Sequence, residues 1–123
     1  MVDFVELEKQ LLEKNQEYEN IVDEYKTAVI SAIEKRNEAK KQYALKYLEL
    51  RAEQDGNGKK KLTEEEARQR AYLETYDYQV EADIAKVTAD TLYEKLEQIK
   101  YEIDSLRSIL SAYKETYERV TVL

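Results

Sequence analysis

Several residue types are missing from this chain or nearly so. Its 123 residues include no histidine, cysteine, tryptophan or proline, and only two glycines. Without histidine and cysteine the chain cannot form a zinc finger, a disulfide, or a catalytic triad or dyad that relies on these residues. These absences remove most common routes to catalysis, so we expect no enzyme activity, no cofactor and no small-molecule substrate.

What the chain has in abundance is charge and helix-forming residues. Charged residues make up 38% of it, and 27 acidic against 20 basic residues give a net charge of −7. This composition is typical of long helices and coiled coils. The sequence therefore predicts an all-α fold, a long antiparallel helical hairpin, and a protein that acts by binding other molecules.

No segment has the features of a targeting signal or a membrane span. The N-terminal residues develop no apolar core after Asp3, and the most apolar stretch, 28–33, is far shorter than the roughly 20 residues that cross a bilayer. We therefore expect a cytoplasmic protein without a membrane partner.

The only strong break in the helical pattern is the segment 54–58, which contains both glycines together with Asp and Asn. These residue types favour tight turns. Thr63 then offers an N-cap, and Glu66 can complete a capping box. We predict a single helical-hairpin domain over 1–123, with a helix over about 3–52, a turn over 53–62 and a second helix over about 63–120.

Apolar residues in the second helix follow alternating steps of three and four, which is the spacing of a coiled-coil seam. We expect this seam to form the contact between helices or between chains. In the first helix the corresponding pattern is interrupted at Lys14 and shifts after Val29. The seam residues of the second helix are Ala85, Ala89, Leu92, Leu96, Ile99, Ile103, Leu106, Leu110, Tyr113 and Tyr117.

Apolar residues outside the seam predict self-association. A helix that is apolar on two sides needs two neighbours, so we expect a homo-oligomer, a dimer or higher, that forms a multi-helix bundle. The alternative is a three-helix bundle within one chain, formed through a kink in the first helix. The residues outside the seam are Leu73, Tyr76, Val80, Ile84 and Val87 in the second helix, and Val22, Val29, Ile30 and Leu48 in the first.

Positive charge is concentrated around the turn. Residues 35–70 hold eleven basic against seven acidic residues, whereas the remainder holds nine against twenty. A basic tip can contact nucleic-acid phosphates, although a run of lysines in a loop can also serve solubility alone. The residues that we expect at a nucleic-acid contact are Lys40, Lys41, Lys59, Lys60, Lys61, Arg68 and Arg70.

Carboxylates are the only groups suited to metal-assisted chemistry. All-helical nucleotide hydrolases hold Mg²⁺ with carboxylates one helical turn apart on facing helices, and Glu74 with Asp77 supplies one such pair. The second pair is missing, because no Glu follows Glu65 or Glu66 at that spacing. A carboxylate–metal hydrolase is therefore a remote alternative, and we assign no catalytic or metal-binding residue.

The turn and the second helix carry a recognisable succession of motifs. A glycine- and lysine-rich turn leads into a capped helix start with acidic and then basic residues (GKKKLTEEEARQRA, 58–71), followed by LET at 73–75 and the seam IDSLRSIL at 103–110. In these motifs, which span about half of the chain, the sequence resembles short all-helical proteins of tailed bacteriophages and prophages.

The resemblance implies a role rather than a reaction. It suggests a non-enzymatic accessory to phage DNA replication or recombination that binds a protein or a nucleic acid in the cytoplasm of a bacterial host. The alternative is an inhibitor or modulator of a host defence protein, which would bind through the acidic helical surface. The resemblance implies no catalytic residue.

Overall fold

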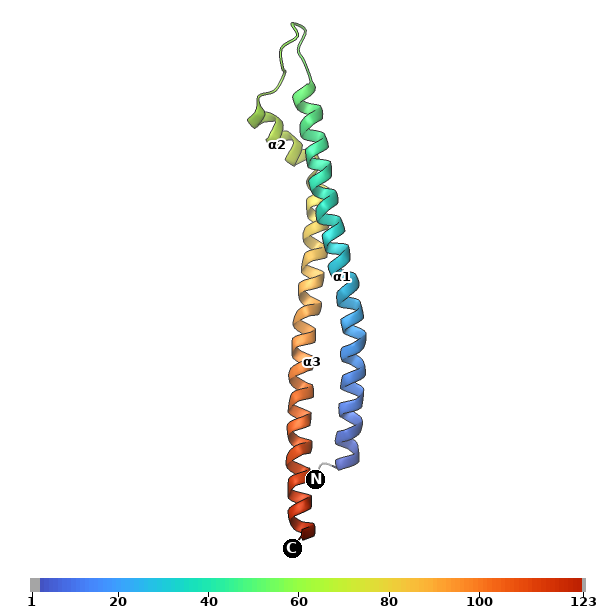
Figure 1. Ribbon diagram of the computed structural model, residues 1–123. Coiled ribbons are helices and arrows are strands. Elements are labelled where there is room, and N and C mark those ends of the chain that lie inside the picture. Colours follow the sequence, from blue (N-terminus) through green and yellow to red (C-terminus); the bar gives the residue numbers. More distant parts are fainter. Residues whose placement is uncertain (1–2, 123) are drawn as a thin grey trace. The chain divides into compact units, whose positions relative to one another are not determined.

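The fold is all-α, as the sequence predicts. The computed structural model describes residues 3–122, with side chains described up to residue 116. It contains α1 (Phe4–Ala52), α2 (Glu64–Glu74) and α3 (Tyr76–Val122), and a narrow turn separates α1 from α2 (Figure 1). α1 is one uninterrupted helix. Together the three helices form an antiparallel helical hairpin.

The chain divides into two compact units. The terminal unit combines Met1–Lys26 with Asp90–Leu123, and the central unit comprises Thr27–Ala89. Each unit pairs part of α1 with part of α3, and the central unit also contains the turn and α2.

The terminal unit has a core of large aliphatic side chains. Ile21 of α1 packs against α3, and the side chains around this contact include two tyrosines. The rings of Tyr25 and Tyr93 approach to 5.8 Å between centroids at a tilt of 47°, which is a favourable aromatic geometry. The buried residues of this core are Ile21, Leu96, Ile99 and Ile103, flanked by Leu11, Tyr18, Val22, Tyr25 and Leu92.

Lys14, which interrupts the apolar pattern of α1, has a specific partner in the terminal unit. Its ammonium nitrogen lies 2.6 Å from a carboxylate oxygen of Glu102 on α3 and 3.4 Å from Glu17. Both Lys14 and Glu102 are half-buried. The polar residue in the seam is therefore matched by a charge of opposite sign on the facing helix.

The central unit has a second, smaller core near the turn. Leu50 of α1 is the most deeply buried large side chain among the described residues, and it contacts Ala67 and Ala71 of α2. Both alanines are fully buried in this contact. Tyr43, Tyr47 and Leu62 pack around this contact.

Farther from the turn, small side chains fill the buried face of the central unit. An open groove there is lined by residues of both long helices, among them Ala28, Ser31, Ala85 and Thr88. The buried residues of this part of the unit are Ala39, Ala82, Ala85 and Ala89. The central unit thus lacks, in this stretch, the large aliphatic side chains that fill the terminal unit.

The start of α2 forms as the sequence predicts. The hydroxyl of Thr63 accepts a hydrogen bond from the backbone N–H of Glu66 at 3.2 Å, and the Glu66 carboxylate accepts one from the Thr63 N–H at 3.4 Å. This capping box satisfies two backbone donors that a helix N-terminus would leave free.

The structure differs from the expectation of one continuous helix after Thr63, because the helix is interrupted at Thr75. The Thr75 hydroxyl donates to the carbonyl oxygen of Ala71 at 2.7 Å, a contact that can bend a helix. The Thr88 hydroxyl makes the same kind of bond to Ile84 within the continuous α3. We therefore attribute the interruption mainly to the packing of α2 against Leu50.

Candidate nucleic-acid interface

The turn between α1 and α2 is an ordered β-type hairpin, which we call the basic hairpin (residues 53–62). The backbone N–H of Asp55 donates to the carbonyl of Lys59 at 2.7 Å, and that of Lys61 donates to the carbonyl of Glu53 at 3.0 Å. Gln54 and Lys60 form an antiparallel bridge between these two pairs.

Asp55 organises the tip of the basic hairpin. Its carboxylate accepts hydrogen bonds from the backbone N–H groups of Asn57 at 2.8 Å and Lys59 at 3.0 Å. The N–H of Gly58 donates to the carbonyl of Asp55 at 3.1 Å, which closes a β-turn. Gly58 then adopts φ 77°, a left-handed conformation that glycine accommodates without strain.

Arg51, in the last turn of α1, holds the base of the basic hairpin. Its guanidinium donates to the carbonyl oxygen of Leu62 at 2.7 Å. This bond joins the end of α1 to the residue that precedes the Thr63 cap. The hairpin is therefore fixed at both its tip and its base.

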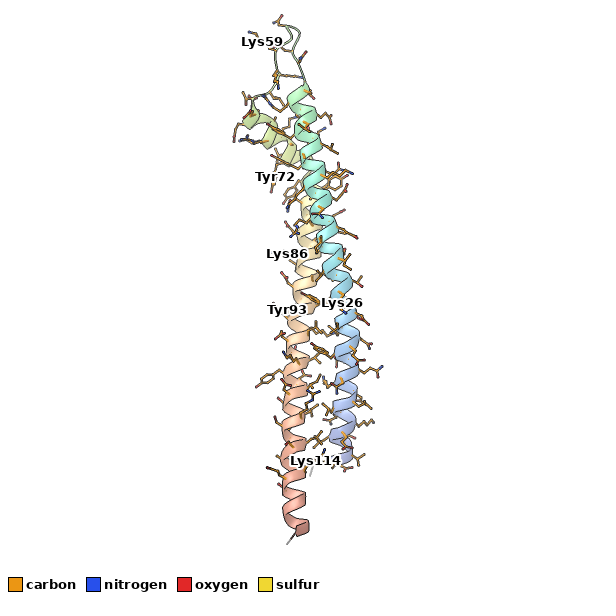
Figure 2. All side chains as sticks on the ribbon, viewed as in Figure 1. Lys26, Lys59, Tyr72, Lys86, Tyr93 and Lys114 are labelled. Atoms are coloured by element: carbon orange, nitrogen blue, oxygen red, sulfur yellow. The ribbon has the colours of Figure 1, made fainter. Side chains whose placement is uncertain are left out.

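Three consecutive lysines, Lys59, Lys60 and Lys61, lie on the returning arm of this hairpin and are exposed. Figure 2 shows Lys59 close to the hairpin tip. Within the described residues none of the three forms an ion pair. Their charges are thus available to an anionic ligand.

The other four predicted contact residues belong to the same unit but do not all join this cluster. Lys40 and Lys41 are exposed on α1, separated from its end at Ala52 by about 17 Å of helix. Arg68 lies 3.7 Å from Glu64, and the Arg70 guanidinium lies 3.1 Å from Glu74. Acidic neighbours therefore offset the charges of Arg68 and Arg70.

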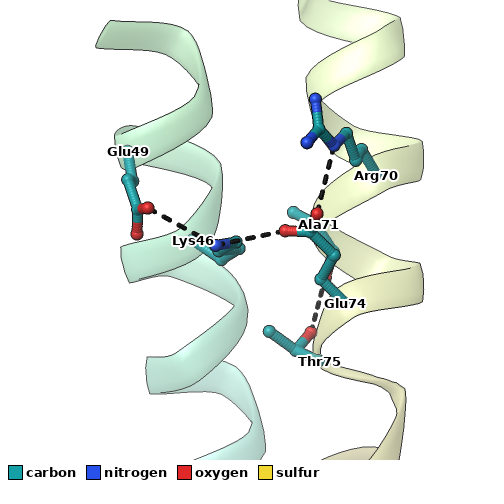
Figure 3. A network of polar contacts seen from close by, with 6 residues as sticks. All are labelled: Lys46, Glu49, Arg70, Ala71, Glu74 and Thr75. Carbon is teal, nitrogen blue, oxygen red and sulfur yellow. Dashed lines mark hydrogen bonds and ion pairs between the residues drawn. The ribbon is translucent and has the colours of Figure 1, made fainter. Parts of the chain in front are cut away.

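A network of charges connects α1 to α2 below the hairpin (Figure 3). The Lys46 ammonium lies 3.1 Å from Glu74 and 3.4 Å from Glu49. The hydrogen bond from Lys46 lowers the pKa of the Glu74 carboxyl, partial burial opposes that shift, and the hydrogen bond from Arg70 adds to it. Glu74 and then Glu49 raise the pKa of Lys46 in return.

This network also bears on the carboxylates that the sequence suggested for a metal. Glu74 is engaged by Lys46 and Arg70, and Asp77 follows it after the interruption at Thr75. Across residues 3–116 no three side chains of the His, Cys, Asp and Glu types gather as metal ligands would.

The predicted seam of the second helix lies mostly on the buried face of α3. In the central unit, Ala85 and Ala89 are buried. In the terminal unit, Leu92 and Leu106 are half-buried and Tyr113 is exposed, whereas the side chain of Tyr117 lies outside the described residues. The remaining seam residues, Leu96, Ile99, Ile103 and Leu110, are buried in the terminal unit.

Sequence reasoning did not identify Asp55, Arg51 and Lys46 as residues that order the site. The sequence does contain a signal for Asp55, because it begins the segment Asp-Gly-Asn-Gly (55–58), and these residue types commonly form turns. For Arg51 and Lys46 no local signal exists, because their partners lie 11 and 28 residues away along the chain.

Comparison of the chain with family models, with curated proteins and with solved structures finds no match. Among the described helices, none is long and apolar enough to span a membrane.

Proposed function

We propose that this chain is a non-enzymatic helical interaction protein that binds nucleic-acid phosphates through the basic hairpin, as an accessory to DNA replication or recombination in a bacterial host infected by, or carrying, a tailed phage. The observation that carries the proposal is the set of three unpaired lysines on one arm of an ordered hairpin. Phosphate contacts of this kind supply affinity without sequence specificity.

The test is a titration of the full chain against fluorescent single-stranded and double-stranded DNA. If the three lysines neutralise three phosphates, raising the salt from about 50 to about 200 mM weakens binding roughly 40-fold for duplex and roughly 20-fold for single strands. The triple variant Lys59→Glu, Lys60→Glu, Lys61→Glu is expected to lose binding at both salt concentrations.

A matched control separates the hairpin from the net charge of the protein. The triple variant Lys9→Glu, Lys95→Glu, Lys100→Glu changes the charge equally, at exposed positions of the terminal unit. This variant is expected to retain at least half of the wild-type affinity. Absence of wild-type binding at about 50 mM salt, or equal losses in both triple variants, contradicts the proposal.

A second candidate function is supported by acidic residues along α3. Asp90, Glu97 and Asp104 of the terminal unit recur every seven residues and are all exposed. Such a row of carboxylates suits the basic groove of a nucleic-acid-binding host protein, which the chain would then inhibit or modulate. The test is a pull-down from host lysate with the wild type and two triple variants. If a host protein still binds the lysine-to-glutamate hairpin variant but no longer binds the variant Asp90→Lys, Glu97→Lys, Asp104→Lys, the result favours this function over the first.

We also propose that the protein works as a homo-oligomer in the cytoplasm. The support is the number of large apolar side chains that remain exposed in the single chain, including Leu48, Leu73 and Ile84. A helix with apolar side chains on a second face can bury them against a neighbouring chain.

A further inference from the structure

Outside the core around Leu50, the central unit leaves several large apolar side chains exposed. The first group, which we call the α1 stripe, consists of Ile30, Ile33, Leu45 and Leu48. Ile30 is 58% exposed and Leu48 is 62% exposed. The 18 residues between them are about five helical turns, so they share one face, and the buried Ala39 midway lies on the opposite face.

α3 carries a comparable group, the α3 stripe, which consists of Tyr76, Val80, Ile84 and Val87. Ile84 is 62% exposed. It is two residues from the buried Ala82, a rotation of about 200° around the helix axis. Ile84 also borders the open groove that α1 and α3 share. The other three residues of the α3 stripe lie still farther around the helix from the buried alanines. The two stripes therefore lie mainly on opposite sides of the central unit.

Charge distinguishes the two sides of the central unit. The α1 segment 27–52 holds six basic and three acidic residues, whereas the α3 segment 76–89 holds one basic and three acidic residues. A partner surface that complements the α1 stripe is therefore apolar with acidic neighbours, and the partner of the α3 stripe is apolar with basic neighbours. A second copy of this chain presents both surfaces.

The exposed area of the two stripes sets the size of such a contact. If each of the eight partly exposed side chains of the two stripes offers about 60 Å² of apolar surface, one pair of stripes brings together roughly 500 Å². This sum counts both partners, so it is about half of the apolar area of a standard interface, which buries about 800 Å² per partner and is roughly 60% apolar. The contact is therefore expected to be weak and to depend on protein concentration.

We infer that copies of this chain associate through a contact between unlike surfaces, in which the α1 stripe of one copy packs against the α3 stripe of the next. The inference rests on the self-association proposed above and is independent of nucleic-acid binding. The first and last copies of such an assembly each keep one unused stripe, so the contact builds a ring or a growing array rather than a closed pair.

The test uses two full-length double variants and their mixture. Ile30→Glu with Leu48→Glu disables the α1 stripe, and Ile84→Glu with Val87→Glu disables the α3 stripe. All four positions are exposed and Glu is a good helix former, so circular dichroism is expected to show unchanged helix content. Light scattering coupled to size exclusion then gives the mass of each species.

Each double variant alone is expected to associate about tenfold more weakly than the wild type, or not at all, because two apolar contacts become buried charges. Mixed in equal amounts, the two variants retain one intact stripe each and are expected to form a species of two chains that grows no further. Wild-type protein is expected to form larger species as its concentration rises.

The control variant, Val5→Glu with Leu12→Glu, changes exposed apolar residues of α1 in the terminal unit and is expected to associate like the wild type. A wild-type chain that stays monomeric overturns both the proposed self-association and this inference. If the wild type associates but either stripe variant alone associates as strongly as the wild type, or the mixture forms no two-chain species, self-association stands and the pairing of unlike stripes is wrong.

Discussion

At the scale of single residues, the terminal unit depends on a charge placed within an apolar seam. The Lys14 ammonium lowers the pKa of Glu102 below its ordinary value of 4.5, against the opposing effect of partial burial. Glu102 in turn raises the pKa of Lys14 above 10.5. Because the pKa of Glu102 is lower in the folded chain than in the unfolded chain, the ion pair stabilises the fold above pH 4.5, and this stabilisation is lost as the pH falls. The raised pKa of Lys14 stabilises the fold below pH 10.5, and that stabilisation is lost as the pH rises.

We therefore predict that Glu102→Gln lowers stability at neutral pH and that the loss depends on pH. The difference between the variant and the wild type is expected to shrink as the pH falls below 4.5, because the wild-type carboxylate becomes protonated there and the ion pair is lost. Urea unfolding at a series of pH values measures this. The control is Glu97→Gln at an exposed site on the same helix, and an equal loss at pH 3 and pH 7 for Glu102→Gln would contradict the prediction.

The buried alanines of α2 lead to a prediction about the side-chain volume that fits between α1 and α2. Ala71 is fully buried against Leu50, so Ala71→Leu forces extra volume into a close contact between α1 and α2. We expect a loss of about 1–3 kcal/mol in the free energy of unfolding. Ala112→Leu, at an exposed position of α3, is the control and should change stability by less than about 0.5 kcal/mol.

At the scale of elements, the interruption between α2 and α3 has two possible causes that can be separated. If Thr75 itself ended α2, Thr75→Ala would join α2 to α3. If packing on Leu50 is responsible, as the uninterrupted helix around Thr88 indicates, Thr75→Ala leaves the interruption in place and changes stability by about 0.5 kcal/mol or less.

We predict that Leu50→Ala, unlike Thr75→Ala, releases α2. The variant is expected to lose about 2–5 kcal/mol in stability, because Leu50 is only 1% exposed in the folded chain. Backbone chemical shifts of residues 73–77 report whether these residues become helical. Continuous helical shifts in Thr75→Ala with no change in Leu50→Ala would reverse the assignment.

The elements also show how much the sequence can predict. The cap at Thr63, the turn at Gly58 and the periodic seam each follow from local spacing, and local spacing is visible in a sequence. The interruption at Thr75 and the pairing of Lys14 with Glu102 depend on which residues of α1 lie opposite α3. That register is set by packing over long sequence separations, so it could not be deduced from one chain.

The candidate nucleic-acid interface could be predicted in part. The sequence predicted seven basic residues near the turn, and their exposure follows from their charge. The acidic partners of Arg68 and Arg70 also have a local signal, because Glu64 and Glu74 lie four residues away on the same helix. The sequence could not show the bond from Arg51 to Leu62 that holds the base of the hairpin, because it joins residues on either side of the turn.

At the scale of the whole molecule, the two units are packed differently. The terminal unit buries Ile21, Ile99 and Ile103, whereas the central unit buries mainly alanines away from Leu50. An alanine removes much less apolar surface from water than an isoleucine does. Resistance to local opening should therefore vary along α1 and α3 even though both helices are continuous.

We predict this difference in amide hydrogen exchange on dilute protein. Amides of segments 18–25 and 95–104 are expected to exchange about 10 to 100 times more slowly than those of segments 28–36 and 80–88, because their opening exposes larger side chains to water. If copies pair through the α1 and α3 stripes, the faster segments are expected to slow as the protein concentration rises, while the slower segments stay unchanged. Uniform exchange along α3 at low concentration would show that the alanine-rich stretch is as stable as the terminal core.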